Sequence, residues 1–150
     1  MQELKVQPIR NGTVIDHIAP GNAIRVLRIL NMPRPGWTSV LTAAMNVPSA
    51  KGRKDILKIE DRELDPTEVN KISLIAPQAT INIVREYEVI RKEVVQLPEK
   101  VSGLVKCPNP NCVTNHEPVK TQFLVAAREP LRLRCGYCDR EVHDVAEHIV

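Results

Sequence analysis

The spacing of apolar residues in the first part of the chain changes from strand-like to helical and back. Residues 13–18 are short and β-branched, which predicts a strand, and residues 22–30 carry apolar side chains at helical spacing. Two prolines and a glycine within residues 32–36 end that helix. Residues 39–47 and 54–60 are again apolar and β-rich, so we expect two further strands there.

A strong helix start follows. Residues 65–68 read Asp-Pro-Thr-Glu, the order of an N-cap, a first helical residue and a capping-box partner. We expect this helix to continue to Pro77, and the β-rich segments 80–84 and 87–95 to form two strands. The order β-α-β-β-α-β with one extra strand is typical of a ferredoxin-like α/β sandwich, an antiparallel sheet with two helices on one face.

The last third of the chain has a different character. Residues 97–100 (Leu-Pro-Glu-Lys) predict a short linker, and the apolar runs at 121–126 and 131–134 predict a small antiparallel β unit. We therefore expect an α+β protein with domains at residues 1–99 and 100–150. A segment of about 50 residues is too small to be stable on a hydrophobic core alone and usually needs disulfides or a metal.

All four cysteines lie in this small domain, in the pattern C-x4-C, a gap of 22 residues, and C-x2-C. Two such turns brought together offer four thiolates to one zinc ion, so we predict a structural Zn²⁺ held by Cys107, Cys112, Cys135 and Cys138. The alternatives are two disulfides, four free thiols in the core, or His116 as a competing ligand. A shell of four cysteines leaves no open position for substrate, so the metal would stabilise the fold rather than perform chemistry.

Charge and composition argue against several classes of function. Lys and Arg number 21 against 18 Asp and Glu, and this net charge of +3 is low for a nucleic-acid binder. No apolar run approaches the roughly 18 residues of a membrane span, and no secretory signal opens the chain, so we expect a soluble cytoplasmic protein. The glycine-loop and nucleophile motifs of common enzymes are missing, so we predict no catalytic residue.

A zinc-ribbon nucleic-acid-binding protein is the alternative function that the cysteines support. The segment from residue 101 onward has six basic and six acidic side chains. Four zinc-bound thiolates would bring its charge to about −2, which repels phosphate. We therefore expect an anion-binding site in the first domain rather than in this segment.

One predicted strand carries the elements of such a site. Lys54, Ile56 and Lys58 alternate with apolar residues, so they share one face of the strand. Two ammonium groups on either side of an apolar side chain suit an anionic, partly flat ligand such as a nucleotide, although a solvated sheet face would look the same. Polar residues of neighbouring strands could join them: Asp16, His17 and Lys92.

Five short strings run in order through nearly the whole chain. They are G-T-V-I-D-H-I at 12–18, N-V-P-S at 46–49, G-R-K-D-x-x-K-I-E at 52–60, A-P-Q-A-T-x-N at 76–82 and C-P-N-x-N-C at 107–112. Each string alone is weakly specific. As an ordered set closed by the C-x2-C turn, they resemble the regulatory chain of aspartate carbamoyltransferase.

This resemblance implies a non-catalytic subunit of an enzyme of pyrimidine biosynthesis. The first domain would bind CTP, ATP or UTP as allosteric effectors and pair with a second regulatory chain as a homodimer, and the zinc domain would dock on the catalytic chain. The implied nucleotide contacts are Val6, Ile9, Asp16, His17, Lys54, Ile56, Lys58, Asn82, Tyr87, Val89 and Lys92. The implied contacts with the catalytic chain are Asn109, Asn111 and Asp139. Pro8 has no N–H, so it offers the ligand no backbone donor.

Overall fold

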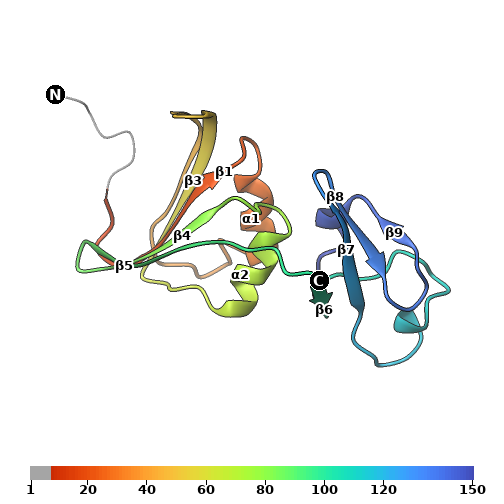
Figure 1. Ribbon diagram of the computed structural model, residues 1–150. Helices are drawn as coiled ribbons and strands as arrows, with labels where there is room; N and C mark the ends of the chain where they lie inside the picture. Colours follow the sequence, from red (N-terminus) through yellow and green to blue (C-terminus); the bar gives the residue numbers. More distant parts are fainter. Residues whose placement is uncertain (1–7) are drawn as a thin grey trace. The chain divides into compact units, whose positions relative to one another are not determined.

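The computed structural model describes residues 8–150, so Val6 lies outside the described residues. The chain divides into two compact units, which we call the N-terminal unit (through Gln96) and the C-terminal unit (Leu97–Val150) (Figure 1). In residues 8–150 no helix has both the length and the apolar character needed to cross a membrane.

The N-terminal unit is one antiparallel five-stranded sheet with two helices on one face (Figure 1). Its elements are β1 (Gly12–Ile18), α1 (Ala23–Leu30), β2 (Leu41–Ser49), β3 (Gly52–Glu60), α2 (Pro66–Ser73), β4 (Thr80–Arg85) and β5 (Glu88–Val94). The strand order is β2-β3-β1-β4-β5. This order is the split βαβ arrangement extended by β5, so the predicted fold class is confirmed.

The core of this unit lies between the sheet and the helices. Leu57 of β3 pairs with Ile15 of β1, which pairs in turn with Ile81 of β4, and these three side chains are almost completely buried. Val26 of α1 and Ile72 of α2 are buried as well. Burial of each such side chain stabilises the fold by about 1.5–3 kcal/mol. Side chains alternate between the two faces along a strand, so Lys54 and Lys58 lie on the face opposite to Leu57, away from the helices.

Helix α2 begins as predicted but ends earlier. The Asp65 carboxylate accepts the Glu68 N–H at 2.8 Å, and the Glu68 carboxylate accepts the Asp65 N–H at 3.1 Å. The helix ends at Ser73, so the expected continuation to Pro77 is wrong. Residues 73–76 are all buried, and four consecutive buried residues do not fit the single stripe that a surface helix presents to a core.

The only tryptophan of the chain, Trp37, lies in the N-terminal unit between α1 and β2. The Arg62 guanidinium lies 5.9 Å from the centre of the indole ring, within the range of a cation–π contact. Arg62 is held there by a salt bridge to Glu68 at 2.6 Å. The buried indole N–H has no hydrogen-bond partner among the described residues.

The C-terminal unit is a small antiparallel sheet with the order β6-β7-β8-β9. Its elements are β6 (Lys100–Ser102), the 3-10 turn η1 (Val113–Asn115), β7 (Gln122–Arg128), β8 (Leu131–Cys135), β9 (Glu141–Val142) and a second 3-10 turn, η2 (Val145–His148). Its fully buried large hydrophobic side chains are few: Val101, Val105, Phe123, Leu133 and Val142. This short list agrees with a domain that needs more than its hydrophobic core.

The predicted linker is shorter than expected and is held in place. Lys100 pairs with Leu124, so β6 begins inside the segment assigned to the linker. The Glu99 carbonyl accepts the Val125 N–H at 3.0 Å, and the Leu97 carbonyl accepts a hydrogen bond from Arg128 at 3.2 Å. Residues 97–99 are therefore bonded to the C-terminal unit rather than free.

Candidate functional site

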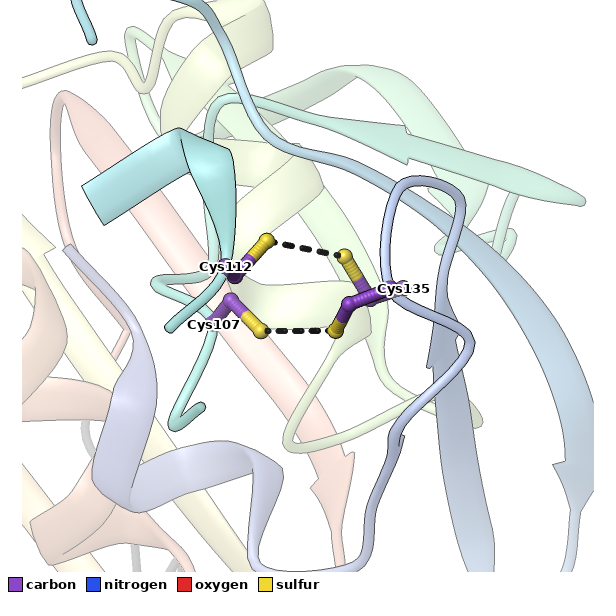
Figure 2. Close-up of side chains that lie close together, drawn as sticks. Cys107, Cys112 and Cys135 are labelled. Carbon is purple, nitrogen blue, oxygen red and sulfur yellow. Dashed lines mark hydrogen bonds between the residues drawn. The ribbon is translucent and has the colours of Figure 1, made fainter. Parts of the chain in front are cut away.

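Two turns bring the four cysteines of the C-terminal unit together. Cys107 and Cys112 bracket the turn before η1, and Cys135 ends β8 three residues before Cys138. The four sulfur atoms all lie within 4.8 Å of one another, with 3.6 Å between Cys107 and Cys138 and 3.8 Å between Cys112 and Cys135. Figure 2 shows Cys107, Cys112 and Cys135 pointing toward one another from the two turns.

This cluster has the dimensions of a zinc site. Four sulfurs placed tetrahedrally at about 2.3 Å from Zn²⁺ are about 3.8 Å apart, close to the observed sulfur distances. All four thiols are free, so the disulfide alternative is not present in the structure. His116 is not a member of the cluster: its Nε2 lies 2.8 Å from the Pro110 carbonyl oxygen. The four cysteines therefore fit one zinc ion.

Each turn supplies one thiol with a raised pKa and one with a lowered pKa. Burial raises the pKa of Cys107 to about 12 and also raises the pKa of Cys135. The hydroxyl of Thr114 donates to the Cys112 sulfur at 3.2 Å and lowers the pKa of that thiol. Burial opposes ionisation of Cys138, but hydrogen bonds, chiefly from the Asn109 side chain, outweigh it and lower its pKa to about 7. Zinc binding displaces the remaining protons.

The residues expected to meet the catalytic chain lie on these turns. The side-chain oxygen of Asn109 accepts the Asn111 N–H at 3.0 Å. The backbone carbonyl of Asn109 accepts a hydrogen bond from the side-chain amide of Asn115 at 2.7 Å, so Asn109 shapes the turn. Asn111 is exposed. Asp139 is also exposed, has a positive φ of 63°, and donates its N–H to the Cys135 carbonyl at 2.9 Å. Asn111 and Asp139 therefore reach the surface beside the metal cluster.

The register of the N-terminal sheet aligns three of the expected nucleotide contacts. Lys58 of β3 pairs with Val14 of β1, Val14 pairs with Asn82 of β4, and Asn82 pairs with Lys92 of β5. Side chains of directly paired residues share a face, so Lys58, Asn82 and Lys92 form one row on the face away from the helices. We call this set the lysine row.

The two lysines of β3 differ in their surroundings. Lys54 forms a salt bridge to Asp16 at 3.0 Å. Lys58 is only 7% exposed and has no hydrogen bond or salt bridge from the described residues. Burial lowers the pKa of Lys58, and the nearby charge of Glu60 opposes that shift only in part. The Lys58 side chain is thus largely buried and has no ion pair among the described residues, whereas Lys54 pairs with Asp16.

Asp16 and His17 lie in a β-bulge of β1. The pairing of β1 with β3 shifts between Ile15 and Ile18, and His17 takes a positive φ of 60°. The His17 ring lies beside β4, with its Nδ1 3.2 Å from the Thr80 hydroxyl. A bulge re-aims side chains that regular pairing would alternate between faces.

The other expected contacts are spread along the unit. Ile9 is buried and Ile56 is half-buried, while Tyr87 and Val89 are exposed. Tyr87 lies in the turn between β4 and β5, where its N–H donates to the Arg10 carbonyl at 2.9 Å. Arg10, just before β1, therefore lies beside that turn.

The sequence interpretation missed Asp55 as a functional candidate. This carboxylate is fully buried on the helix-facing side of β3. It accepts backbone N–H groups from Gly21 at 2.8 Å, Ala23 at 3.1 Å and Asn46 at 2.7 Å. A signal was present, because a charged residue shares the strand face of the apolar Leu57 and Ile59.

Together the two units define a class of two-domain protein in which a split βαβ sandwich is joined to a metal-binding β unit. Residues 4–96 match the family described as the aspartate carbamoyltransferase regulatory chain, allosteric domain, and residues 99–146 match the metal binding domain of the same chain. The chain belongs to the family of aspartate carbamoyltransferase regulatory chains, which are non-catalytic subunits of a pyrimidine-pathway enzyme.

Proteins that carry this family name are similar to the chain over nearly its whole length. The relative from Thermococcus gammatolerans is 54% identical over 143 residues, which cover 95% of this chain and 94% of the relative. The relative from Pyrococcus abyssi is 51% identical over 145 residues (96% and 95%), and that from Methanothrix thermoacetophila is 52% identical over 152 residues (99% and 98%). The resemblance found in the sequence is confirmed.

Proposed function

We propose that this chain is the nucleotide sensor of its complex. Residues 1–99 bind CTP, ATP or UTP, and residues 100–150 hold one Zn²⁺ and transmit the signal to the catalytic chain. A second regulatory chain completes a homodimer. The reduced thiols that the zinc site needs suit the cytoplasm, where we place the assembly.

The observation that carries this proposal is the state of Lys58. The Lys58 side chain is only 7% exposed and its charge has no ion pair among the described residues, so an anion that joins it would reduce the cost of removing this charge from water. Lys92 lies in the same lysine row, two strands beyond β1, and is exposed. A triphosphate lying across the row would therefore meet a buried cation and an exposed one, and Asn82 between them offers both an amide donor and an acceptor.

The zinc ion has a structural role in this proposal. Cys107, Cys112, Cys135 and Cys138 would hold it in a closed shell, which links the two turns and supplies no reactive position. Asn111 and Asp139 lie on or beside those turns and would meet the catalytic chain. Loss of the metal would then separate the sensor from the enzyme by unfolding the docking surface.

Titration calorimetry tests the nucleotide site in the full-length, zinc-loaded chain. We expect CTP, ATP or UTP to bind, and the Lys92→Ala variant to bind about tenfold to a hundredfold more weakly, the loss expected of one lysine–phosphate contact. Arg91→Ala is the matched control, because Arg91 is the adjacent cation but pairs with Ile83, outside the lysine row. Equal losses in both variants would contradict the assignment of the row.

Co-purification tests the docking role. Zinc-loaded chain should retain the catalytic chain on a column, and chain stripped of zinc should not. Nucleotide binding with no retention of the catalytic chain would overturn the transmission role and leave the sensor role standing.

A further inference from the structure

The Asp55 carboxylate lies between two irregular segments of the N-terminal unit. One oxygen accepts the Asn46 N–H at 2.7 Å, and the other accepts the N–H groups of Gly21 at 2.8 Å and Ala23 at 3.1 Å. No salt bridge within residues 8–150 involves this carboxylate, which is fully buried. Three backbone donors alone therefore balance a charge that is costly to bury.

The strands on both sides of Asp55 depart from regular pairing at this level. The register of β2 with β3 shifts between Ala44 and Val47, and Asn46, inside that shift, has a φ of 60°. The register of β1 with β3 shifts just before Ile18, the residue that pairs with Asp55. One side chain thus bonds to the bulge of β2 and to the turn that follows the bulge of β1.

Asp55 also completes the start of α1. Asn22 stands at the N-cap of this helix but makes no side-chain capping bond. The Asp55 oxygen takes that role from a different strand by accepting the Ala23 N–H, and a negative charge at a helix N-terminus is favourable. The path of the chain from β1 into α1 therefore depends on Asp55.

We propose that Asp55 is a positioning residue of the nucleotide site. By holding the turn after β1, it fixes the bulge that presents Asp16 and His17 beside the lysine row, although Asp55 itself lies on the opposite face of the sheet. This inference rests on the proposed nucleotide-binding function. According to this inference, one buried carboxylate determines where the β1 residues of the site lie.

The Asp55→Asn variant tests the assignment. The amide keeps the shape of the side chain but turns an NH₂ group toward at least one backbone N–H, so at least one of the three hydrogen bonds of Asp55 is lost. We expect the full-length, zinc-loaded variant to bind CTP about tenfold more weakly by calorimetry. Asp61→Asn is the control, since it changes the net charge equally at an exposed position and should leave affinity unchanged.

A double-mutant cycle separates positioning from general destabilisation. If Asp55 acts by placing His17, the losses from Asp55→Asn and His17→Ala are not additive, because the second change removes a contact already lost. The losses from Asp55→Asn and Lys92→Ala should add, since Lys92 lies on β5. Additive losses in both cycles would overturn the inference.

The outcomes also separate this inference from the proposed function. Wild-type chain that binds no nucleotide overturns both, whereas normal CTP binding by a folded Asp55→Asn variant overturns the inference alone. Should that variant fail to fold, amide hydrogen exchange of the wild-type chain decides. Saturating CTP should then slow exchange at Gly21, Ala23 and Asn46 at least tenfold more than at Trp37, and equal effects would overturn the inference.

Discussion

Lys54 and Lys58 stand four residues apart on one face of β3, yet their charges have different surroundings. Asp16 pairs with Lys54 at 3.0 Å, whereas the largely buried Lys58 has no ion pair among residues 8–150. Ion pairing reduces the charge that Lys54 can offer to a ligand. The capacity of this face to attract an anion is therefore concentrated on Lys58 and Lys92.

Replacement of Lys58 by methionine should stabilise the chain and impair its function. Lys58→Met removes a charge from a largely buried side chain that has no ion pair among the described residues, and it keeps a similar volume, so we expect a gain of about 1 kcal/mol in the free energy of unfolding. Affinity for CTP should fall about tenfold to a hundredfold. Thermal unfolding and calorimetry measure the two effects, and Lys92→Ala, at an exposed site, should lower affinity alone. A destabilised Lys58→Met variant would contradict the unpaired state of Lys58.

The lowered pKa of Lys58 should make both the stability of the chain and the proposed nucleotide binding depend on pH. Burial lowers this pKa in the folded chain below its usual 10.5, so between the two values the unfolded chain binds more protons, and stability rises with pH. A phosphate group favours the protonated form, so CTP affinity should fall as pH rises through the lowered pKa. Calorimetry from pH 7 upward should show this fall in the wild-type chain and a weaker one in Lys58→Met.

At the scale of elements, the sequence predicted those features that depend on residues close together in the chain. The alternation around Ile56 predicted the faces of β3, and the Asp-Pro-Thr-Glu order predicted the start of α2. The early end of α2 and the start of β6 at Lys100 were missed, because burial and pairing with residues distant in sequence determine them. Asp55 was missed for the same reason, since its three donors come from two other segments.

The same contrast applies to the metal cluster. Cysteine spacing predicted all four residues that the structure brings together. The hydrogen bond from Thr114 to Cys112 was not predicted, because spacing carries no information about hydroxyl groups nearby. The sheet of the C-terminal unit joins these turns, so a metal ion held by the four cysteines would stabilise the unit.

Loss of one zinc ligand should unfold the C-terminal unit alone. In Cys112→Ser or Cys135→Ser we expect elemental analysis to find no bound zinc and circular dichroism to show loss of the small sheet. Calorimetry should show unchanged CTP binding by the N-terminal unit. A folded, zinc-free variant that still retains the catalytic chain would contradict the structural role of the metal.

A milder change tests the hydrogen bond to the cluster. Thr114→Val removes the hydroxyl that lowers the pKa of Cys112, so more work is needed to ionise that ligand. We expect zinc affinity to fall about tenfold, the lower end of the effects found for groups that support metal ligands. Competition with a chelator measures it, and Thr121→Val, whose hydroxyl donates to the Val105 carbonyl, is the control.

At the scale of the whole molecule, the proposed function requires a signal to pass from the N-terminal unit to the C-terminal unit, and we expect the segment between the units to carry it. Coupling of this kind is reciprocal and amounts to about 1–3 kcal/mol, so a substrate analogue on the catalytic chain must change nucleotide affinity by the same factor. Leu97 and Glu99 are bonded to β7 within the C-terminal unit, so the chain passes from one unit to the other between Gln96 and Leu97.

Lengthening this connection should abolish regulation but not binding. An insertion after Glu99 would disturb its bond to Val125, so Gly-Ser residues are better placed between Gln96 and Leu97, at the division of the two units. We expect zinc content, CTP affinity and assembly to be retained while the effector response is lost. Nucleotide affinity measured with and without a saturating substrate analogue tests this, and an undiminished difference in the lengthened chain would show that the signal takes another path.

The position of Trp37 has a spectroscopic consequence. Because the chain has one tryptophan and it lies in the N-terminal unit, indole fluorescence excited at the red edge reports on the surroundings of Trp37 in that unit. The nearby Arg62 makes the emission sensitive to the start of α2. Chelation of zinc should therefore leave the emission spectrum unchanged while dichroism falls, and an optical assay that follows fluorescence alone would score a chain with an unfolded docking domain as intact.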